Sequence, residues 1–397
     1  MKASPVFPHR RNDVIMMTFL KRYTEGALVL DTDWGCMRYV LEKRTKSDFE
    51  STVEALLSID GVALAQRHRI GENLFATLRS HEGDVCLAYM NYNHTLSVVT
   101  DPLEGRQAPP LAKWDFERLT TPKVTFIDLK SPVAAKEGNG LCLVYTLSDG
   151  SFLIYDGGYR EDGEFLIDFL EENNVRHEKP RIAAWVLTHS HGDHYFAMTE
   201  IAEKYAHRIT VEDFVVNARA KAYEFEQYES YLGEHFASKG LPRFEGARLV
   251  RPHTGQKLCY RDAEIEILNT QEEILPGHFR WLNETAIVSR VYLGGQSVMM
   301  PADAELGVDV MIPTIYGDAL KSDILQQTHH GFSGGSYTFY DLCRPEVAFW
   351  TCTAASFVKY TQPQYNNGYN YYLLGLAREH YHYGNGNVTL ELPYKGK

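Results

Sequence analysis

The sequence predicts a mixed α/β (α+β) fold built from short buried strands and amphipathic helices. Apolar runs of about five residues, bounded by glycine, proline or acidic turn residues, recur along the chain and are typical of strands. Other stretches repeat apolar residues at helical spacing, as in 164–173, where Phe165 and Phe169 share one face with two leucines. With 397 residues, 44% of them hydrophobic and 23% charged, the chain has the composition of a globular protein and is long enough for two domains.

The first part of the chain, residues 1–118, is predicted to be a small α+β domain followed by a linker. Ser47 and Glu50 have the spacing of a capping box, which predicts a helix that runs towards Gly61. The proline-containing stretch 101–119 has few periodic apolar residues and is typical of a linker. Strands of an antiparallel meander are expected at 27–31, 37–41, 73–78, 85–92 and 96–99.

Residues 119–397 are predicted to form a second domain with two β-rich halves and flanking helices. Ser148-Asp149-Gly150 and Gly294-Gly295 have the composition of tight hairpin turns. Helices are expected at 164–173, 195–205, 222–238 and 370–380. Strands are expected at 124–129, 141–147, 151–155, 182–187, 211–216, 247–251, 256–260, 263–268, 285–293, 296–300, 347–352 and 387–392.

The most informative stretch is the loop His189-Ser190-His191-Gly192-Asp193-His194. It follows the apolar run 182–187 and precedes a predicted helix, so four potential ligands lie on a strand-to-helix loop. A rigid scaffold can direct short side chains from such a loop to one point. Imidazoles together with a carboxylate suit zinc or another first-row divalent ion. The loop therefore predicts a metal site.

This loop, with the pattern His-x-His-x-Asp-His, resembles the signature of the metallo-β-lactamase superfamily. Three further segments resemble motifs of that family and occur in the expected order. They are Asp156-Gly157-Gly158, Ala302-Asp303 (where the family usually has Gly-Asp) and His329-His330-Gly331. The resemblance covers roughly residues 123–397 and implies an αββα sandwich, preceded here by the small α+β domain.

Two details resemble one branch of the superfamily. Asn283-Glu284-Thr285-Ala286-Ile287-Val288 resembles an Asn-x-x-Ser-Leu-Val segment, and His329-His330-Gly331 resembles a His-His-Gly-Ser segment, with Phe332 and then Ser333 here. Both segments occur in the metallo-hydrolase domain of late-competence DNA-uptake proteins and in phosphorylcholine esterases. This chain has no apolar run long enough to cross a bilayer, so we expect no membrane channel and no role in uptake.

The resemblance implies a site with two divalent metal ions. Zn²⁺ is the expected ion, with Mn²⁺ and Fe²⁺ as alternatives. By the same resemblance, His189 and His191 bind the first metal, and Asp193 and His194 bind the second. Asp303 bridges both, because the two oxygens of a carboxylate can span two neighbouring ions.

The first metal needs a third ligand from the stretch between Glu266 and Asp303. His278 is the best candidate, because it lies on a loop before a strand, ahead of Asp303. Asn283, as a weaker ligand, and His253 are the alternatives.

The second metal needs one histidine of the His329-His330 pair. Because adjacent residues on an extended chain point in opposite directions, we expect His330 to bind the metal and His329 to line the pocket. Asp156 is expected to orient the loop or a ligand histidine without binding metal itself.

The resemblance and this ligand set lead us to expect a metal-dependent hydrolase that uses a hydroxide held by the two metals. A phosphodiester is the favoured substrate, because two cations neutralise charge on phosphoryl oxygens. Asp193, His329 and Asn283 are the expected catalytic residues. The alternatives are hydrolysis of a carboxylic ester, thioester, lactone or lactam, and a metal-binding or interaction protein without activity.

Charge and cysteine usage constrain partners and compartment. Forty basic and 52 acidic residues give a net charge of −12, which disfavours a dedicated nucleic-acid binder without excluding a local basic groove. The expected partner is therefore a small-molecule or phosphodiester substrate, with no membrane, and the oligomeric state stays open. Six scattered cysteines without Cys-x-x-Cys spacing, and an N-terminus without the apolar core of a signal peptide, indicate a cytoplasmic protein with free thiols.

A late segment of the chain, 360–383, is rich in tyrosine. Most of these rings are expected to pack in the ordinary way. Tyr365 and Tyr369 lie in the polar loop 364–369 and are the candidates for substrate contact, because aromatic rings stack on bases or surround quaternary ammonium groups.

Overall fold

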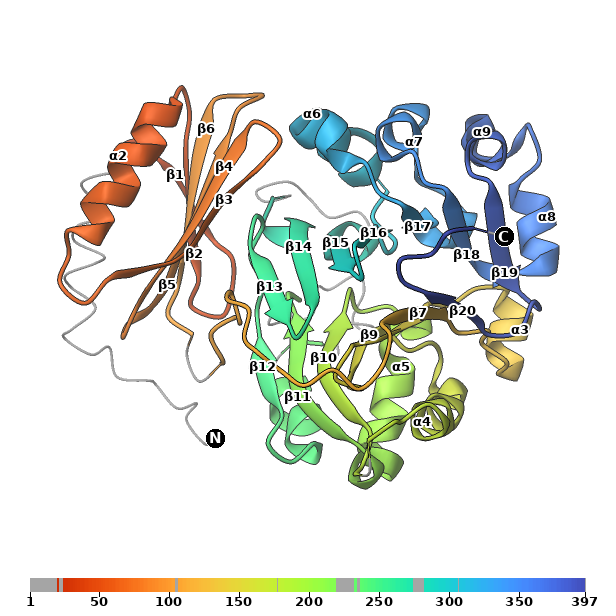
Figure 1. Cartoon of the computed structure of the whole chain (residues 1–397). Coiled ribbons are helices and arrows are strands. Elements are labelled where there is room, and N and C mark those ends of the chain that lie inside the picture. The colour runs from red at the N-terminus through yellow and green to blue at the C-terminus, as the bar shows by residue number, and fades with distance from the viewer. Residues whose placement is uncertain are drawn as a thin grey trace, which may run out of the picture.

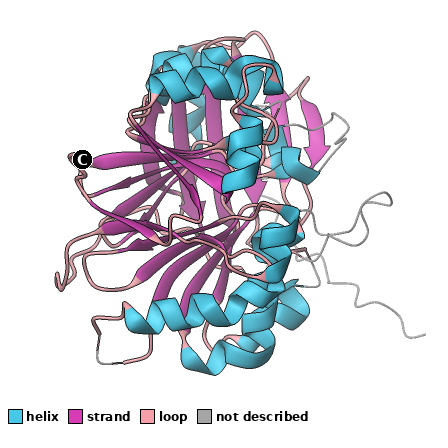
Figure 2. Ribbon diagram, turned by 90° about the vertical axis from the view of Figure 1, so that its right-hand side faces the viewer, coloured by secondary structure: helices cyan, strands magenta, loops and turns pink. Residues whose placement is uncertain are grey.

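The chain folds into three β-sheets with helices on their outer faces (Figure 1). The computed structural model describes residues 20, 24–103, 106–176, 178–218, 232–233, 236–273, 282–305 and 307–396. Two seven-stranded sheets lie against each other between two layers of helices, as Figure 2 shows. The predicted αββα sandwich is confirmed.

The N-terminal sheet is antiparallel, and one helix covers its outer face. Helix α2 (Lys46–Leu57) packs Phe49, Val53 and Leu56 against it. The helix begins two residues earlier than predicted, because Thr45 and Asp48 form the capping box, each side chain bonding the other residue's backbone N–H. In spatial order the strands are β1 (Leu28–Asp31), β2 (Met37–Leu41), β6 (Thr95–Asp101), β5 (Gly83–Met90), β4 (Asn73–Ser80) and β3 (Ala63–Ile70).

The first sheet of the sandwich carries the histidine-rich loop 189–194. Its central strands β8 and β9 are buried along their whole length and β10 is buried beyond its first residue, as expected for strands covered on both faces. The pairs β9–β10, β10–β11 and β11–β12 are parallel. In spatial order the strands are β12 (Arg248–Val250), β11 (Thr210–Val216), β10 (Arg181–Leu187), β9 (Phe152–Asp156), β8 (Cys142–Thr146), β7 (Lys123–Phe126) and β20 (Val388–Glu391).

The second sheet of the sandwich is antiparallel at one side and parallel at the other. Phe126 and Phe349 stack across the two sheets at 5.2 Å, and the hydroxyls of Tyr155 and Ser289 are 2.8 Å apart, so the sheets share one core. In spatial order the strands are β13 (Lys257–Tyr260), β14 (Ala263–Asn269), β15 (Val288–Leu293), β16 (Gln296–Met300), β17 (Ile324–Gln326), β18 (Val347–Thr353) and β19 (Glu379–Tyr383).

Two helical layers enclose the sandwich (Figures 1 and 2). Helices α4 (Gly163–Glu172) and α5 (Gly192–Glu200) lie beside the first sheet. The other helices are α3 (Pro132–Glu137), α6 (Ile312–Tyr316), α7 (Tyr337–Cys343), α8 (Ala354–Tyr360) and α9 (Tyr369–Leu376).

Two differences between the predicted and the observed secondary structure have a clear cause, and one predicted helix lies mostly outside the described residues. Strand β3 was not predicted, because Gln66, Arg67 and Arg69 interrupt its apolar pattern. The predicted helix 370–380 was too long, because the chain leaves α9 at Ala377 and enters β19. Most of the predicted helix 222–238 lies outside the described residues.

Two global expectations can be compared with the structure. All six cysteines are buried and free, as predicted. In the described part of the chain, no helix has the length and hydrophobicity needed to span a membrane. The domain boundary at residues 118–119 stays a prediction.

The inner face of the N-terminal sheet packs closely on the sandwich. Phe75 of β4 fills the space in front of Gly255, where an added Cβ would lie 1.9 Å from the ring. Gly255 has a φ of +89°, so both its backbone and its surroundings require glycine.

A buried network of ion pairs crosses the same interface. Nε2 of His253 lies 3.1 Å from a carboxylate oxygen of Asp101, and its Nδ1 lies 2.9 Å from Glu272. Arg106 pairs with Asp101 at 2.6 Å, and Arg251 pairs with Glu272 at 3.1 Å. Each charge is satisfied by an opposite one, as burial of charge requires.

Candidate metal centre

The histidine-rich loop lies at the carboxyl end of β10, and His191 caps the start of α5. The other predicted ligands follow neighbouring strands. Asp156 ends β9, Asp303 follows β16, and His330 follows β17. Residues that are distant in sequence therefore meet at one edge of the two sheets.

Four side chains form the first of two ligand groups: Asp193, His194, Asp303 and His330. Nε2 of His330 lies 3.0 Å from Oδ2 of Asp193 and 3.3 Å from Oδ2 of Asp303. Nε2 of His194 lies 3.2 Å from the same Asp303 oxygen. The predicted ligands of the second metal thus converge on one point.

The second group consists of His189, His191 and Asp303. Nε2 of His189 lies 3.0 Å from Nδ1 of His191 and 4.0 Å from Oδ2 of Asp303. Asp303 belongs to both groups, so its position is that of a carboxylate between two metal sites.

Side chains behind these groups orient the imidazoles. Asp156 lies 2.8 Å from Nδ1 of His194 and accepts hydrogen bonds from the backbone N–H and the hydroxyl of Thr188. Nδ1 of His330 lies 2.7 Å from the hydroxyl of Thr351. In both histidines Nδ1 is engaged, so Nε2 is directed to the centre, as is typical of metal-binding imidazoles.

The electrostatics of the centre also favour a cation. Burial alone would lower the pKa of His330, but the carboxylates of Asp303 and Asp193 raise it to about 9. The pKa of His194 is raised in the same way against its burial. Burial and the neighbouring imidazoles lower the pKa of His189 well below its ordinary value. The buried carboxylate of Asp303 and the partly buried carboxylate of Asp193 thus attract positive charge to one small volume.

The donor atoms fit a divalent metal. Nε2 of His194, Nε2 of His330 and Oδ1 of Asp303 are buried and make no well-directed hydrogen bond, although carboxylate oxygens lie 3.0–3.3 Å from the two nitrogens. Buried polar atoms are rarely left without a partner, and such atoms require an explanation. Imidazole nitrogens and carboxylate oxygens facing one another suit zinc, manganese or iron.

The backbone at the ends of the strands adopts an uncommon conformation. Asp156, Ala302, His329 and His330 have φ values of 54°, 51°, 44° and 56°. The premise that His329 and His330 continue an extended chain was therefore wrong, because both residues occupy the left-handed region, in a tight turn. The turn still separates the two rings, so that His330 is buried in the centre and His329 lies at its mouth.

His329 is held by polar neighbours outside the ligand groups. Its Nδ1 lies 2.8 Å from Glu305 and 2.7 Å from the hydroxyl of Ser333. Its Nε2 lies 3.2 Å from the amide nitrogen of Asn283 and 3.6 Å from Oδ2 of Asp303. His329 and Asn283, both predicted as catalytic, therefore lie side by side at the mouth of the centre.

Of the three candidates for the third ligand of the first metal, the structure describes two. His278 lies outside the described residues. His253 lies away from the centre, in the network with Asp101 and Glu272 described above. Asn283 contacts His329, and its buried Oδ1 has no partner.

The two predicted tyrosine contacts lie in different surroundings. Tyr365 packs on Tyr360 at 5.0 Å, and Lys359 lies over both rings. Tyr369 instead packs on Tyr337 at 4.8 Å.

Some contributing residues were not predicted from the sequence. Glu305 was missed, although its position two residues after Asp303 is a signal that could have been used. Thr188 and Thr351 were missed because nothing in their local sequence distinguishes them from other threonines at the ends of strands.

One other group of potential ligands occurs among the described residues, namely Cys36, Asp101 and His253. Arg106 lies 3.7 Å from the sulfur of Cys36 and also pairs with Asp101. Because the ring nitrogens of His253 are engaged and an arginine already supplies the positive charge, this group is an ion-pair network and does not fit a metal.

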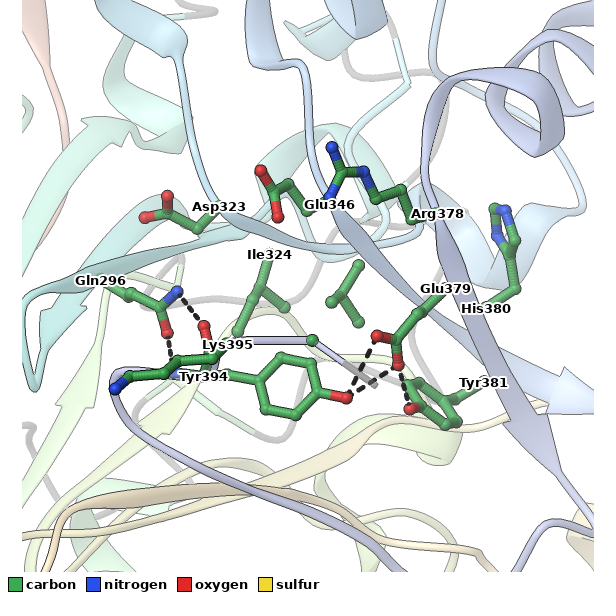
Figure 3. A pocket seen from close by; sticks show the side chains of 12 residues that line it. Gln296, Asp323, Ile324, Glu346, Arg378, Glu379, His380, Tyr381, Tyr394 and Lys395 are labelled. Atoms are coloured by element: carbon green, nitrogen blue, oxygen red, sulfur yellow. Dashed lines mark hydrogen bonds between the residues drawn. The ribbon is translucent and has the colours of Figure 1, made fainter.

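A pocket of about 360 Å³ lies at the opposite end of the strands (Figure 3). It is bordered by Ile324 and Glu379, which begin β17 and β19, whereas the metal ligands follow strand ends. Tyr394 donates to Glu379, and Gln296 bonds the backbone of Tyr394 in both directions. These contacts hold the C-terminal segment against the sheet beside the pocket.

The chain is similar to known proteins in one family and in several solved structures. Residues 135–337 match the Metallo-beta-lactamase superfamily. A search of curated proteins found no match. Similar solved structures include CmlA, a diiron beta-hydroxylase from Streptomyces venezuelae (14% identity, 68% of this chain and 54% of that chain, TM-score 0.42). They also include the metallo-beta-lactamase fold protein YhfI from Bacillus subtilis (14%, 68% and 100%, 0.41) and human tRNase Z, short form (13%, 58% and 92%, 0.30).

The match to CmlA covers about half the length of that protein. The superfamily match spans more than half of this chain and includes the histidine-rich loop, Asp303 and His330. The chain therefore belongs to the metallo-β-lactamase superfamily.

Proposed function

We propose that this protein is a zinc-dependent phosphodiester hydrolase. The observation that carries the proposal is the position of His329 and Asn283. Nε2 of His329 lies 3.6 Å from Oδ2 of Asp303, Asn283 contacts His329, and both residues lie outside the two ligand groups. The second N–H of the Asn283 amide, which is not used by His329, can bind a non-bridging oxygen of a phosphodiester, where the negative charge lies, and His329 holds that amide in place.

The residues of the two groups would hold one ion each, with Asp303 between them. Two bound divalent ions would supply an activated water at neutral pH and neutralise the charge on the phosphoryl oxygens. The chain's own residues would orient the substrate. Glu305 and Ser333 both contact Nδ1 of His329, so the ring is fixed with Nε2 towards Asn283 and Asp303.

Motif details add support for this substrate class. The Asn283 segment and the His329-His330-Gly331 segment resemble those of the competence-protein hydrolase and phosphorylcholine esterase branch. The structure brings the two segments into contact through Asn283 and His329.

A substrate screen tests the proposal. Purified protein loaded in turn with Zn²⁺, Mn²⁺ and Fe²⁺ is incubated with bis(p-nitrophenyl) phosphate, p-nitrophenyl acetate, a thioester, a lactone and a chromogenic lactam. We expect turnover of the phosphodiester with Zn²⁺ and its loss in His189→Ala. Hydrolysis of a carbonyl substrate without any phosphodiester turnover would refute the assignment.

The screen also addresses an inactive metal-binding protein, the remaining alternative. Such a protein would turn over none of the substrates. Metal analysis of the same preparations distinguishes an inactive protein from a poorly loaded one. A preparation that binds two equivalents of metal and still has no activity is inactive for a reason other than missing metal.

A further inference from the structure

An aromatic strip leads outward from the metal centre. The ring of His329 lies 5.4 Å from that of Phe332, which lies 6.0 Å from Tyr360, which in turn lies 5.0 Å from Tyr365. The strip thus begins at a residue beside the bridging carboxylate and ends at the surface.

Phe332 is the ring of this strip that is open to a ligand. It is 52% exposed, whereas Tyr360 is 8% exposed and Lys359 lies over the rings of Tyr360 and Tyr365. Its contacts with His329 and Tyr360 have interplanar angles of 69° and 77°, so neither neighbour stacks on its faces.

The position of Phe332 is fixed by the backbone. Its N–H donates to the carbonyl of His329 at 2.7 Å, which closes the tight turn. Gly331 has a φ of +86°, and a Cβ there would lie 2.9 Å from the ring of Trp350, so the turn lies directly on the core. A fixed aromatic ring loses little freedom when a ligand stacks on it.

Phe332 is also a departure from the branch pattern, in which Ser follows His-His-Gly directly. Here Phe332 stands between Gly331 and Ser333, and Ser333 still reaches His329. The extra residue therefore adds an aromatic ring at the mouth without displacing the hydroxyl contact.

We infer that Phe332 selects phosphodiesters that carry a planar aromatic group on the ester oxygen nearest His329. This inference rests on the proposed function and names the substrate class within it. Stacking of an aromatic ligand on a protein ring commonly changes affinity by about fivefold to a hundredfold. We therefore expect Phe332 to contribute at least about tenfold to the affinity for an aryl ligand.

Binding of phosphonates by the zinc-loaded protein tests the inference without requiring turnover. Phenylphosphonate, cyclohexylphosphonate and methylphosphonate share the anionic head group and differ in the attached group. Calorimetry should show phenylphosphonate binding about tenfold or more tightly than the other two. Phe332→Ala should remove that preference, and Phe332→Tyr should restore it.

Controls separate stacking from general changes. Tyr371→Ala removes a ring of similar exposure, 54%, that lies outside the aromatic strip, and it should keep the preference. Equal binding of phenyl- and cyclohexylphosphonate, no binding of any phosphonate, or a phenyl preference that persists in Phe332→Ala would each overturn the inference.

The outcome is distinguishable from that of the proposed function. If the phenyl preference depends on Phe332 but no phosphodiester is hydrolysed, the aromatic subsite stands and the reaction assigned to it fails. If phosphodiesters are hydrolysed, Phe332→Ala should raise KM for bis(p-nitrophenyl) phosphate about tenfold and change kcat much less. An unchanged KM in that variant would count against the subsite alone.

Discussion

His253→Gln removes a positive charge from the buried network between the N-terminal sheet and the sandwich. His253 is 1% exposed and lies between the carboxylates of Asp101 and Glu272. Burial alone would lower the pKa of His253, but Glu272 and Asp101 raise it from 6.5 to about 9. A shift of roughly two to three units corresponds to about 3 kcal/mol of stabilisation in the folded state.

The pH range of this contribution follows from the direction of the shift. Because the folded pKa lies above the unfolded one, the contribution is complete below about pH 6.5 and is lost as the pH rises through about 9. We therefore expect His253→Gln to lower the free energy of unfolding by about 3 kcal/mol at pH 6. At pH 10 the variant and the wild type should be nearly equal in stability.

Urea unfolding at pH 6 and pH 10, followed by tryptophan fluorescence and circular dichroism, measures both values. His68→Gln is the matched control, because burial lowers the pKa of His68 to about 4 and so gives the opposite pH dependence. The reasoning is refuted if His253→Gln loses the same stability at both pH values, or if it loses none at pH 6.

Three further predictions concern the metal centre. Asp303→Ala should bind at least one metal fewer per chain and lose activity while keeping its circular dichroism spectrum; two bound metals with full activity would exclude a bridging role. His330→Ala should lose metal, whereas His329→Ala should keep the wild-type metal content with a lower kcat. Loss of metal in His329→Ala but not in His330→Ala would show that His329, and not His330, binds the metal. Ala302→Gly should change the free energy of unfolding by less than about 1 kcal/mol, because relief of the left-handed φ of 51° is offset by loss of a fully buried methyl group; a loss of several kcal/mol would show that Ala302 is not strained.

The sequence identified the parts of the centre that depend on local spacing. His189, His191, Asp193 and His194 belong to one strand-to-helix loop, so a single segment carries both their identity and their proximity. Asp303 was identifiable because it follows an apolar strand in the order that the family resemblance implies. The sandwich was predictable for a similar reason, since its strands are short apolar runs with clear turns between them.

Features that depend on contacts between distant segments were not predictable. His253 seemed a possible metal ligand in the sequence, but its neighbours are Asp101 of the N-terminal sheet and Glu272, and neither is close to it in the chain. The separation of His329 and His330 was anticipated for the wrong reason, because alternation assumes an extended chain and the structure has a left-handed turn. The aromatic strip also joins separate segments, since Phe332 meets Tyr360 across the fold.

The left-handed residues at the strand ends have a consequence for metal selectivity. Asp156, Ala302, His329 and His330 each leave a strand in a conformation that is costly for a residue with a Cβ atom. The main chain therefore fixes where the Cα–Cβ bonds of these residues point, and the hydrogen bonds of His194 and His330 fix their rings. The distances between the donor atoms would then be set by the protein and not by the bound ion. Ionic size and preferred coordination geometry would then decide between zinc, manganese and iron, because the ligand residues have little freedom to move towards the ion.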